Sequence, residues 1–425
     1  MKTRLAFLAL AALVLACCIW LNWEPELNAA DREPLEKQTI IVASDLHYLS
    51  PALTDYGPYF QSLIENADGK VTAYGKELVE AFVAQVLEKS PDALILSGDL
   101  TFNGAEQSHI ELAALLHPLK DAGIRVLVLP GNHDLENPMA ASFQRNSYTL
   151  VSSVDAARFS NIYASYGYQD ALLRDRASLS YVVELLPNLW VLLVDVNTAE
   201  APGCLTEQTL SWVERQLKDA AQNGAWVLAV SHQNLLQHNG IFTAGYRMEN
   251  ADCLLALYES YGVICNLSGH LHIQHIAQSG TGLPDIATSS LAVSPNQYGV
   301  FELGERSASY GAVPVDVSAW AASTGQTSLD LLDFTRYSYD VFWNTSYCQG
   351  LAELQTVKNA EAMASYFADV NAAYFAGDMT KCECKDDLLL QWKQQPSFLS
   401  VYLQSIVPDI GNDYTQFLFD YQEAP

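Results

Sequence analysis

Positive charge is scarce in this chain of 425 residues. Lysine and arginine together number 22, whereas aspartate and glutamate number 49, which gives a formal net charge of −27 at pH 7. A protein that binds nucleic acid through its surface field needs basic residues to neutralise the phosphates, and no basic patch is present. The composition therefore argues against a nucleic-acid-binding surface, and we expect no nucleic acid among the partners of this protein.

Cysteine is also sparse, and its spacing does not suit a metal site. Six cysteines follow Cys17 and Cys18, and two of them form Cys382-Glu383-Cys384. A second Cys-x-Cys and a cluster of histidines around this segment are both missing, which disfavours a thiolate metal site. We expect instead a disulfide from this segment to Cys348, because such bonds form in an oxidising compartment. Internal repeats and low-complexity tracts are absent as well.

Charged residues are absent from Leu5–Leu21, which follows the short basic segment Met1–Arg4. This arrangement is typical of a targeting segment or a membrane anchor. The end of the run, Val14–Cys17, resembles a bacterial lipobox. Three alternatives stay open: a lipoprotein lipidated at Cys17, a cleaved signal peptide and an uncleaved anchor. In each of them we expect the rest of the chain outside the cytoplasmic membrane, as a membrane lipoprotein or a secreted protein.

Polar residues that can bind a metal follow five predicted strands. The apolar run Val126–Pro130 is followed by Asn132, His133 and Asp134. An amide oxygen and an imidazole can ligate a metal or move protons, and neither helps the end of a strand to pack. In open α/β sheets, ligands bind beyond the carboxyl ends of the strands. The other four segments, with the residues that follow them, are Thr39–Ser44 with Asp45 and His47, Ala93–Ser97 with Asp99, Trp226–Ser231 with His232, and Gly262–Ser268 with His270 and His272.

The order of these residues resembles the calcineurin-like metallophosphoesterase superfamily. Its pattern is D-x-H, G-D, G-N-H-[DE], H and G-H-x-H, and every motif is present here between residues 38 and 305. The segment Gly98–Thr101, followed by Asn103-Gly104, looks most like the class III bacterial cyclic-nucleotide phosphodiesterases. The chain as a whole is similar to the secreted or lipid-anchored bacterial members.

The resemblance implies a site for two metal ions. Asp45, His47 and His272 would hold one ion, Asn132, His232 and His270 would hold the other, and Asp99 would bridge them. Seven ligand side chains are too many for a single ion, and their types suit Mn, Fe or Zn, among which the residues do not decide. Two ions about 3.5–4 Å apart can clamp the attacking and leaving oxygens of a phosphoryl displacement.

His133 is the motif histidine that the resemblance does not assign to a metal. The resemblance implies that His133 protonates the leaving oxygen and, with Asn132, contacts the phosphoryl group. Asp134 either orients His133 or raises its pKa, with a turn or helix N-cap residue as the alternative. Arg247 is the one Lys or Arg between His232 and His270. It is a candidate contact for the substrate phosphate, with the start of a surface helix as the alternative.

The resemblance implies an α/β fold. We expect a four-layer αββα metallophosphoesterase sandwich of two mixed β-sheets flanked by helices, plus a helical C-terminal domain. The expected boundaries are a signal peptide or anchor at 1–21, a linker at 22–37, the phosphoesterase domain at 38–320 and the helical domain at 321–425.

Four local expectations follow from periodicity and composition. Residues 48–69 are irregular, and residues 139–176 are mostly helical. The strands at 286–288, 300–303 and 312–317 complete the second sheet, and residues 351–374 form one helix. Four aromatic residues of the helical insertion either pack inside it or offer a stacking surface for a base; they are Phe159, Tyr163, Tyr166 and Tyr168.

These patterns together predict a metal-dependent phosphoric ester hydrolase whose substrate is a small phosphate ester. We expect a phosphodiesterase acting on cyclic nucleotides or related diesters. An extracytoplasmic phosphomonoesterase or nucleotidase is one alternative, and a non-catalytic metal-binding surface lipoprotein is another. His133 argues against the last, because a purely structural metal site closes its coordination shell and has no use for an unligated imidazole.

Overall fold

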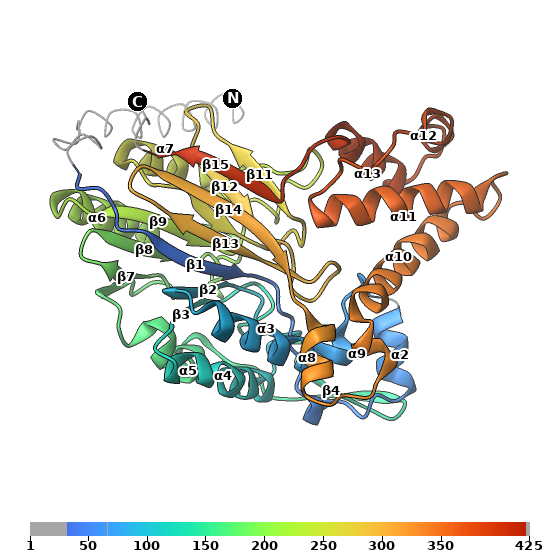
Figure 1. The fold of residues 1–425 in the computed structure, drawn as a ribbon, viewed down its shortest axis with the longest axis horizontal. Helices are drawn as coiled ribbons and strands as arrows, with labels where there is room; N and C mark the ends of the chain where they lie inside the picture. Colours follow the sequence, from blue (N-terminus) through green and yellow to red (C-terminus); the bar gives the residue numbers. More distant parts are fainter. Residues whose placement is uncertain (1–31, 66, 422–425) are drawn as a thin grey trace, which may run out of the picture.

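Two β-sheets face each other in the computed structural model, which describes residues 32–65 and 67–421 (Figure 1). Helices cover the outer faces of both sheets, and a group of further helices lies at one end of them. The predicted class, two mixed sheets flanked by helices with a helical C-terminal region, is confirmed.

The first sheet has six strands in the order β15-β14-β13-β1-β2-β3. β1, β2 and β3 run parallel, with Ile41 beside Leu94 and Ile95 beside Leu127, whereas β13, β14 and β15 add on antiparallel. Parallel neighbours need a crossover, and helices supply it. The strands are β1 (Gln38–Ala43), β2 (Ala93–Ser97), β3 (Arg125–Leu129), β13 (Gln297–Leu303), β14 (Ser307–Pro314) and β15 (Gln416–Asp420), and the helices are α3 (Gly75–Lys89) and α4 (Glu106–Asp121).

The second sheet has seven strands in the order β11-β12-β10-β9-β8-β7-β6. β8, β9, β10 and β12 run parallel, and β6, β7 and β11 are antiparallel to their neighbours. Its outer face packs on α6 (Glu207–Gln222) and α7 (Ala251–Tyr261). The strands are β6 (Leu173–Arg174), β7 (Tyr181–Leu186), β8 (Leu189–Val194), β9 (Trp226–Ser231), β10 (Asn266–Ser268), β11 (His275–Gln278) and β12 (Pro284–Ala287).

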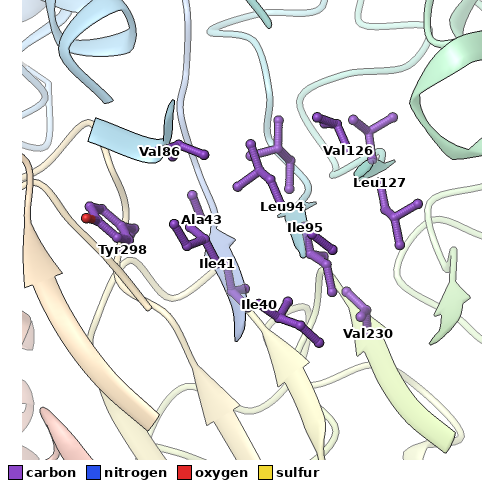
Figure 2. Packing of buried hydrophobic residues seen from close by; sticks show 14 of the residues in the cluster. Ile40, Ile41, Ala43, Val86, Leu94, Ile95, Val126, Leu127, Val230 and Tyr298 are labelled. Atoms are coloured by element: carbon purple, nitrogen blue, oxygen red, sulfur yellow. The ribbon is translucent and has the colours of Figure 1, made fainter. Parts of the chain in front are cut away.

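The central core lies between the two sheets and under α3. Figure 2 shows Ile40 and Ile95 of the first sheet pointing towards Val230 of β9, while Val86 of α3 approaches the opposite face of β1. All four side chains are fully buried. Because both faces of β1 and β2 are covered, these strands are continuous apolar runs rather than alternating ones. Their rigidity fixes the positions of the loops that follow them.

The expected place of β13 and β14 was wrong. Both strands belong to the first sheet, where β13 pairs antiparallel with β1, and only β12 of the three predicted strands joins the second sheet. Periodicity shows which face of a strand is buried, but the partner strand is set by the path of the chain after β12. β15 then pairs with β14, so the chain returns to the first sheet after the C-terminal helices.

Two insertions also differ from expectation. Residues 48–69 contain a helix, α2 (Pro58–Glu65), after the short 3-10 turn at Pro51–Leu53. Residues 139–176 are not mostly helical: they begin with a hairpin, β4 (Ala141–Gln144) and β5 (Ser147–Leu150), and continue with α5 (Ala156–Ile162) and a π-turn at Ala164–Tyr168. The four aromatic residues considered for base stacking are buried in the central core, which excludes that alternative for them; they are Phe159, Tyr163, Tyr166 and Tyr168.

The helix expected over residues 351–374 is two helices. The first ends at Glu353, and the second begins after Asn359, whose φ of 70° is incompatible with a continuous helix. The expected disulfide is not formed either: Cys348, Cys382 and Cys384 are all reduced. The C-terminal helices are α8 (Val317–Ser323), α9 (Leu329–Leu332), α10 (Phe334–Glu353), α11 (Ala360–Ala376), α12 (Asp386–Lys393) and α13 (Phe398–Ile406).

The predicted targeting segment, Leu5–Leu21 with Cys17, lies outside the described residues. Within residues 32–65 and 67–421, no helix has the length and apolar character needed to cross a membrane.

Candidate metal centre

Seven of the predicted site residues converge where five strands end. β1, β2 and β3 are parallel, and so are β9 and β10, so each set of strands ends at one edge of its sheet. Five of these residues have positive φ, a conformation that costs a non-glycine residue about 1–2 kcal/mol and that is concentrated at functional sites. They are Asp45 (53°), His47 (43°), Asp99 (48°), His270 (68°) and His272 (62°).

The first cluster joins the ends of β1, β2 and β10. His272 Nε2 lies 3.0 Å from His47 Nε2 and 3.3 Å from Asp45 Oδ1. His47 Nε2 lies 3.8 Å from both Asp45 Oδ1 and Asp99 Oδ2. Two imidazoles and two carboxylates that face one point in this way can hold a metal ion.

The second cluster joins the ends of β2, β3, β9 and β10. His232 Nε2 lies 3.3 Å from Asp99 Oδ2 and 3.2 Å from Asn132 Oδ1. His270 shares this cluster with Asp99 and His232. Asp99 therefore belongs to both clusters, and its Oδ2 is the point at which they meet.

Hydrogen bonds to backbone carbonyls fix the protonation of two of these imidazoles. His232 Nδ1 lies 2.9 Å from the carbonyl of Ser97, and His270 Nε2 lies 2.9 Å from the carbonyl of Gly245. Since a carbonyl only accepts, each of these nitrogens must donate, and in the neutral ring the other nitrogen keeps its lone pair. His232 Nε2 and His270 Nδ1 are thereby set up as metal ligands.

The burial of the two carboxylates supports a cation at this place. Asp45 is 0% exposed and Asp99 is 1% exposed. Among the described residues, Asp45 Oδ1 has no hydrogen-bond partner, although a buried charged oxygen without one is costly. Burial would raise the pKa of Asp99, but the charge and hydrogen bond of His232 hold it well below its usual range. The residues present thus fit divalent metal ions, whose charge would satisfy these oxygens.

His133 faces the clusters without belonging to either. Its Nδ1 donates to the carbonyl of Phe102 (2.9 Å), and its backbone N–H donates to Asp99 Oδ1 (2.8 Å). Its Nε2 lies 3.9 Å from Asp99 Oδ2, and 39% of the side chain is exposed. The ring is held from behind and presents Nε2 towards the site, so that the second proton of the imidazolium form would face the reacting groups.

Asp134 does not orient His133. Its carboxylate is fully buried and accepts from the backbone N–H groups of Gly131 (2.9 Å), Leu100 (3.0 Å) and Thr101 (2.9 Å), as well as from the Thr101 hydroxyl (2.9 Å). The predicted orienting role is therefore wrong, because Phe102 supplies the partner of His133 Nδ1. Asp134 ties the loop after β3 to the loop after β2.

Arg247 is engaged within its own loop. Its guanidinium donates to the carbonyl of Leu235 (2.8 Å) and to Asp252 Oδ1 (2.5 Å). These bonds use some of the N–H groups of the guanidinium, and a contact between Arg247 and a substrate phosphate stays a prediction.

Two residues near the first cluster have no motif in the sequence. Asp68 Oδ2 lies 3.6 Å from His272 Nδ1 and accepts from Lys70 Nζ at 2.5 Å. Lys70 is 8% exposed, which is unusual for a lysine and requires a paired carboxylate. Because both residues lie in the loop after α2, far from any strand end, only the folded chain places them beside His272.

Comparison with known proteins agrees with this geometry. The model of the calcineurin-like phosphoesterase family matches residues 38–274, and that of the C-terminal domain of cyclic nucleotide phosphodiesterase matches residues 316–413. A probable cyclic nucleotide phosphodiesterase of Ruthia magnifica subsp. Calyptogena magnifica is 25% identical over 219 residues, which are 51% of this chain and 77% of that protein. The glycerophosphodiester phosphodiesterase GpdQ of Enterobacter lignolyticus is 26% identical over 191 residues, which are 44% of this chain and 58% of that protein.

Solved structures share the fold. A dimetal phosphatase from Danio rerio superimposes with a TM-score of 0.50 and 14% identity, covering 66% of this chain and 97% of that one.

Proposed function

The chain belongs to the calcineurin-like phosphoesterase family and is a hydrolase of phosphoric esters, and from this premise we propose that it hydrolyses phosphodiesters, cyclic nucleotides foremost, at a site for two metal ions. The observation that carries the proposal is the place of Asp99. Its Oδ2 lies 3.8 Å from His47 Nε2 on one side and 3.3 Å from His232 Nε2 on the other. A carboxylate shared by two ligand sets is the feature expected of a bridged pair of ions.

We assign one ion to Asp45, His47 and His272 and the other to Asn132, His232 and His270, with Asp99 between them. Imidazole, amide and carboxylate ligands without a thiolate suit Mn, Fe or Zn. When bound, the ions would draw electron density from the phosphoryl oxygens and activate the attacking water. The protein fixes the ligands, and the burial of Asp45 and Asp99 strengthens their electrostatic interactions.

His133 is proposed to move the proton to the leaving oxygen. Its tautomer is set by Phe102, and its exposed Nε2 can reach a substrate that lies over Asp99. The ring sits beside the clusters and touches His47 edge-on, with 4.9 Å between the ring centroids. Because Nδ1 keeps its hydrogen for the carbonyl of Phe102, a proton at Nε2 makes the ring an imidazolium, which can give that proton to the leaving oxygen.

Two observations support a diester over a monoester. The similar proteins named above carry diesterase names, and the C-terminal region matches a domain described from cyclic nucleotide phosphodiesterases. A diester also bears one negative charge where a monoester bears up to two, and the chain as a whole carries a formal net charge of −27. We further propose that the protein acts outside the cytoplasmic membrane, on the strength of its first 21 residues.

The test compares bis(p-nitrophenyl) phosphate, a diester, with p-nitrophenyl phosphate, a monoester, in the presence and absence of Mn²⁺. The Asp99→Ala variant is the control. Metal-dependent cleavage of the diester that the variant loses is the expected result. A preference for the monoester would replace this proposal with a phosphatase or nucleotidase. Metal binding without hydrolysis of either substrate would refute the assigned catalytic role of the site.

A further inference from the structure

A cavity of about 290 Å³ adjoins the metal centre on the side of the C-terminal helices. His270, His272 and Asp68 line one end of it, so it opens directly onto the candidate metal ligands. The opposite walls come from α10, α11 and α13, which stand at one end of the two sheets in Figure 1. The segment after β9 closes it with Phe242 and Tyr246.

The C-terminal helices are firmly attached at this point. Leu271 and Ile273, which alternate with the metal-site histidines, are buried in the same apolar cluster as Phe367 and Tyr374 of α11. The backbone N–H of Gln274 donates to the carbonyl of Phe375 at 3.1 Å. The walls of the cavity are therefore held in a defined position relative to the metal centre.

Aromatic rings run along the cavity without interruption from the metal centre outwards. His270 contacts Tyr246 (5.5 Å between ring centroids), Tyr246 contacts Phe242 (4.7 Å), and Phe242 contacts Tyr402 (5.6 Å). Tyr402 is stacked on Phe398, with 4° between the ring planes. Phe398 is 59% exposed and Tyr246 is 38% exposed, so a flat ligand would cover apolar surface that now faces water.

Away from the metal centre, the polar side chains that line the cavity are uncharged. Asn371 and Ser346 form a buried pair on the α10–α11 wall, with Asn371 Nδ2 donating to Ser346 Oγ at 3.0 Å. An amide has two such N–H groups, so the second can serve an acceptor on a ligand. Among the described residues that line the cavity there is no lysine or arginine, and Asp68 is acidic. A second phosphate or another anion is therefore a poor occupant.

We propose that this cavity binds the base of a nucleotide substrate while the phosphate lies at the metal centre. The assignment rests on the proposed diesterase function for the position of the phosphate. A base is flat, uncharged and edged with hydrogen-bond acceptors, which matches the rings and the Asn371–Ser346 pair. The volume is at the lower end of the range for ligand pockets, about 300–1,000 Å³, and so suits one base rather than two.

The kinetic test uses Phe398→Ala and Phe242→Ala, which remove rings that are not fully buried. Leu390→Ala on α12 is the matched control, because Leu390 is 58% exposed and does not line the cavity. We expect kcat/KM for adenosine 3′,5′-cyclic phosphate to fall roughly 5- to 100-fold in each Phe variant, the range that follows from losing one stacked ring. Hydrolysis of glycerophosphoethanolamine, a diester without a base, should be unchanged. An equal loss on both substrates, or no loss on either, would overturn the assignment.

A binding measurement separates this inference from the proposed function. Saturation-transfer NMR with adenosine 5′-monophosphate should place the strongest saturation on the base protons H2 and H8 of the ligand in the wild type and in Leu390→Ala. The signal should weaken in Phe398→Ala and Phe242→Ala. If the base protons are saturated but the protein hydrolyses no diester, the proposed function is refuted and the assignment of the cavity to a base stands. Hydrolysis by a protein that shows no base saturation would refute the cavity assignment alone.

Discussion

Gly98, which directly precedes Asp99, offers the sharpest test of how the metal centre is built. Its φ is +100°, and a Cβ added there would lie 2.5 Å from His232 Nδ1 and 2.6 Å from His232 Cγ. His232 is fully buried and tied to the carbonyl of Ser97, so its ring cannot rotate away. The change Gly98→Ala must therefore move His232 or the backbone that carries Asp99.

The size of that movement follows from the contact distance. An ordinary carbon contact begins near 3.4 Å, and 3.4 minus 2.5 leaves a displacement of about 0.9 Å. His232 now lies 3.2–3.3 Å from Asn132 and Asp99, so a shift of this size breaks the second cluster. A misplacement near 1 Å can cost roughly 10²-fold in rate, which is the loss of kcat/KM that we expect.

Backbone strain must be separated from the steric effect. Gly282 has a φ of +95°, and no atom lies within 4 Å of an added Cβ, so Gly282→Ala carries the strain without the clash. Both variants should lose about 1–2 kcal/mol of unfolding free energy from the positive φ, and Gly98→Ala about 1–3 kcal/mol more from overpacking.

The assays are hydrolysis of bis(p-nitrophenyl) phosphate, metal content by inductively coupled plasma mass spectrometry, and urea unfolding. Gly98→Ala should bind less metal than the wild type, and Gly282→Ala the same amount. If Gly98→Ala kept activity and metal content within twofold of Gly282→Ala, the rigid contact between the two loops would not exist as described.

Three further predictions concern residues with separable roles. His133→Ala should keep its metal content and lower kcat by ~10²–10⁴-fold, since it removes the proposed proton donor; turnover equal to the wild type would end that assignment. Asp134→Asn should lower the unfolding free energy in urea by on the order of 1–3 kcal/mol, because an NH₂ group would face N–H donors; an unchanged midpoint would contradict this. His275 lies near His238 in a buried pair (3.0 Å), and burial, reinforced by His238, lowers the pKa of His275 to about 3. An unfolded histidine titrates at about 6.5, so the unfolded chain binds the extra proton and stability falls as the pH drops from about 6.5 to about 3. His275→Gln should flatten that pH dependence of unfolding by up to about 1.4 kcal/mol per pH unit, and an unaltered slope would show that His275 does not titrate there.

The side chains of the metal centre could be found from the sequence because each follows a strand. A buried parallel strand is a short apolar run, and the residues just beyond it lie at an edge where other strands also end. Asp45, Asp99 and His232 are placed by this local rule alone. Asp68 could not be found, because nothing in its neighbourhood marks its approach to His272.

The role of Asp134 depended on distant partners. In the sequence, the nearest candidate for a hydrogen-bond partner of Asp134 is His133. In the fold, its carboxylate accepts from the backbone N–H groups of Leu100 and Thr101, more than thirty residues earlier. The aromatic residues show the same effect. Tyr163 is fully buried in the core, whereas Phe398 stands exposed on the wall of the cavity that adjoins the metal centre, although both lie in aromatic-rich segments.

The sequence by itself determined the family and the strand-end residues, since these depend on local periodicity and on the order of short motifs, and the resemblance to that family implied the two-sheet architecture. Only the tertiary structure decided that β13 and β14 join the first sheet, that the chain returns to this sheet in β15, and that α10, α11 and α13 wall a cavity at the metal centre. The physical reason is that strand pairing and side-chain burial are set by contacts between segments far apart in the chain. A periodic pattern records that a face is covered, but it does not record which segment covers it.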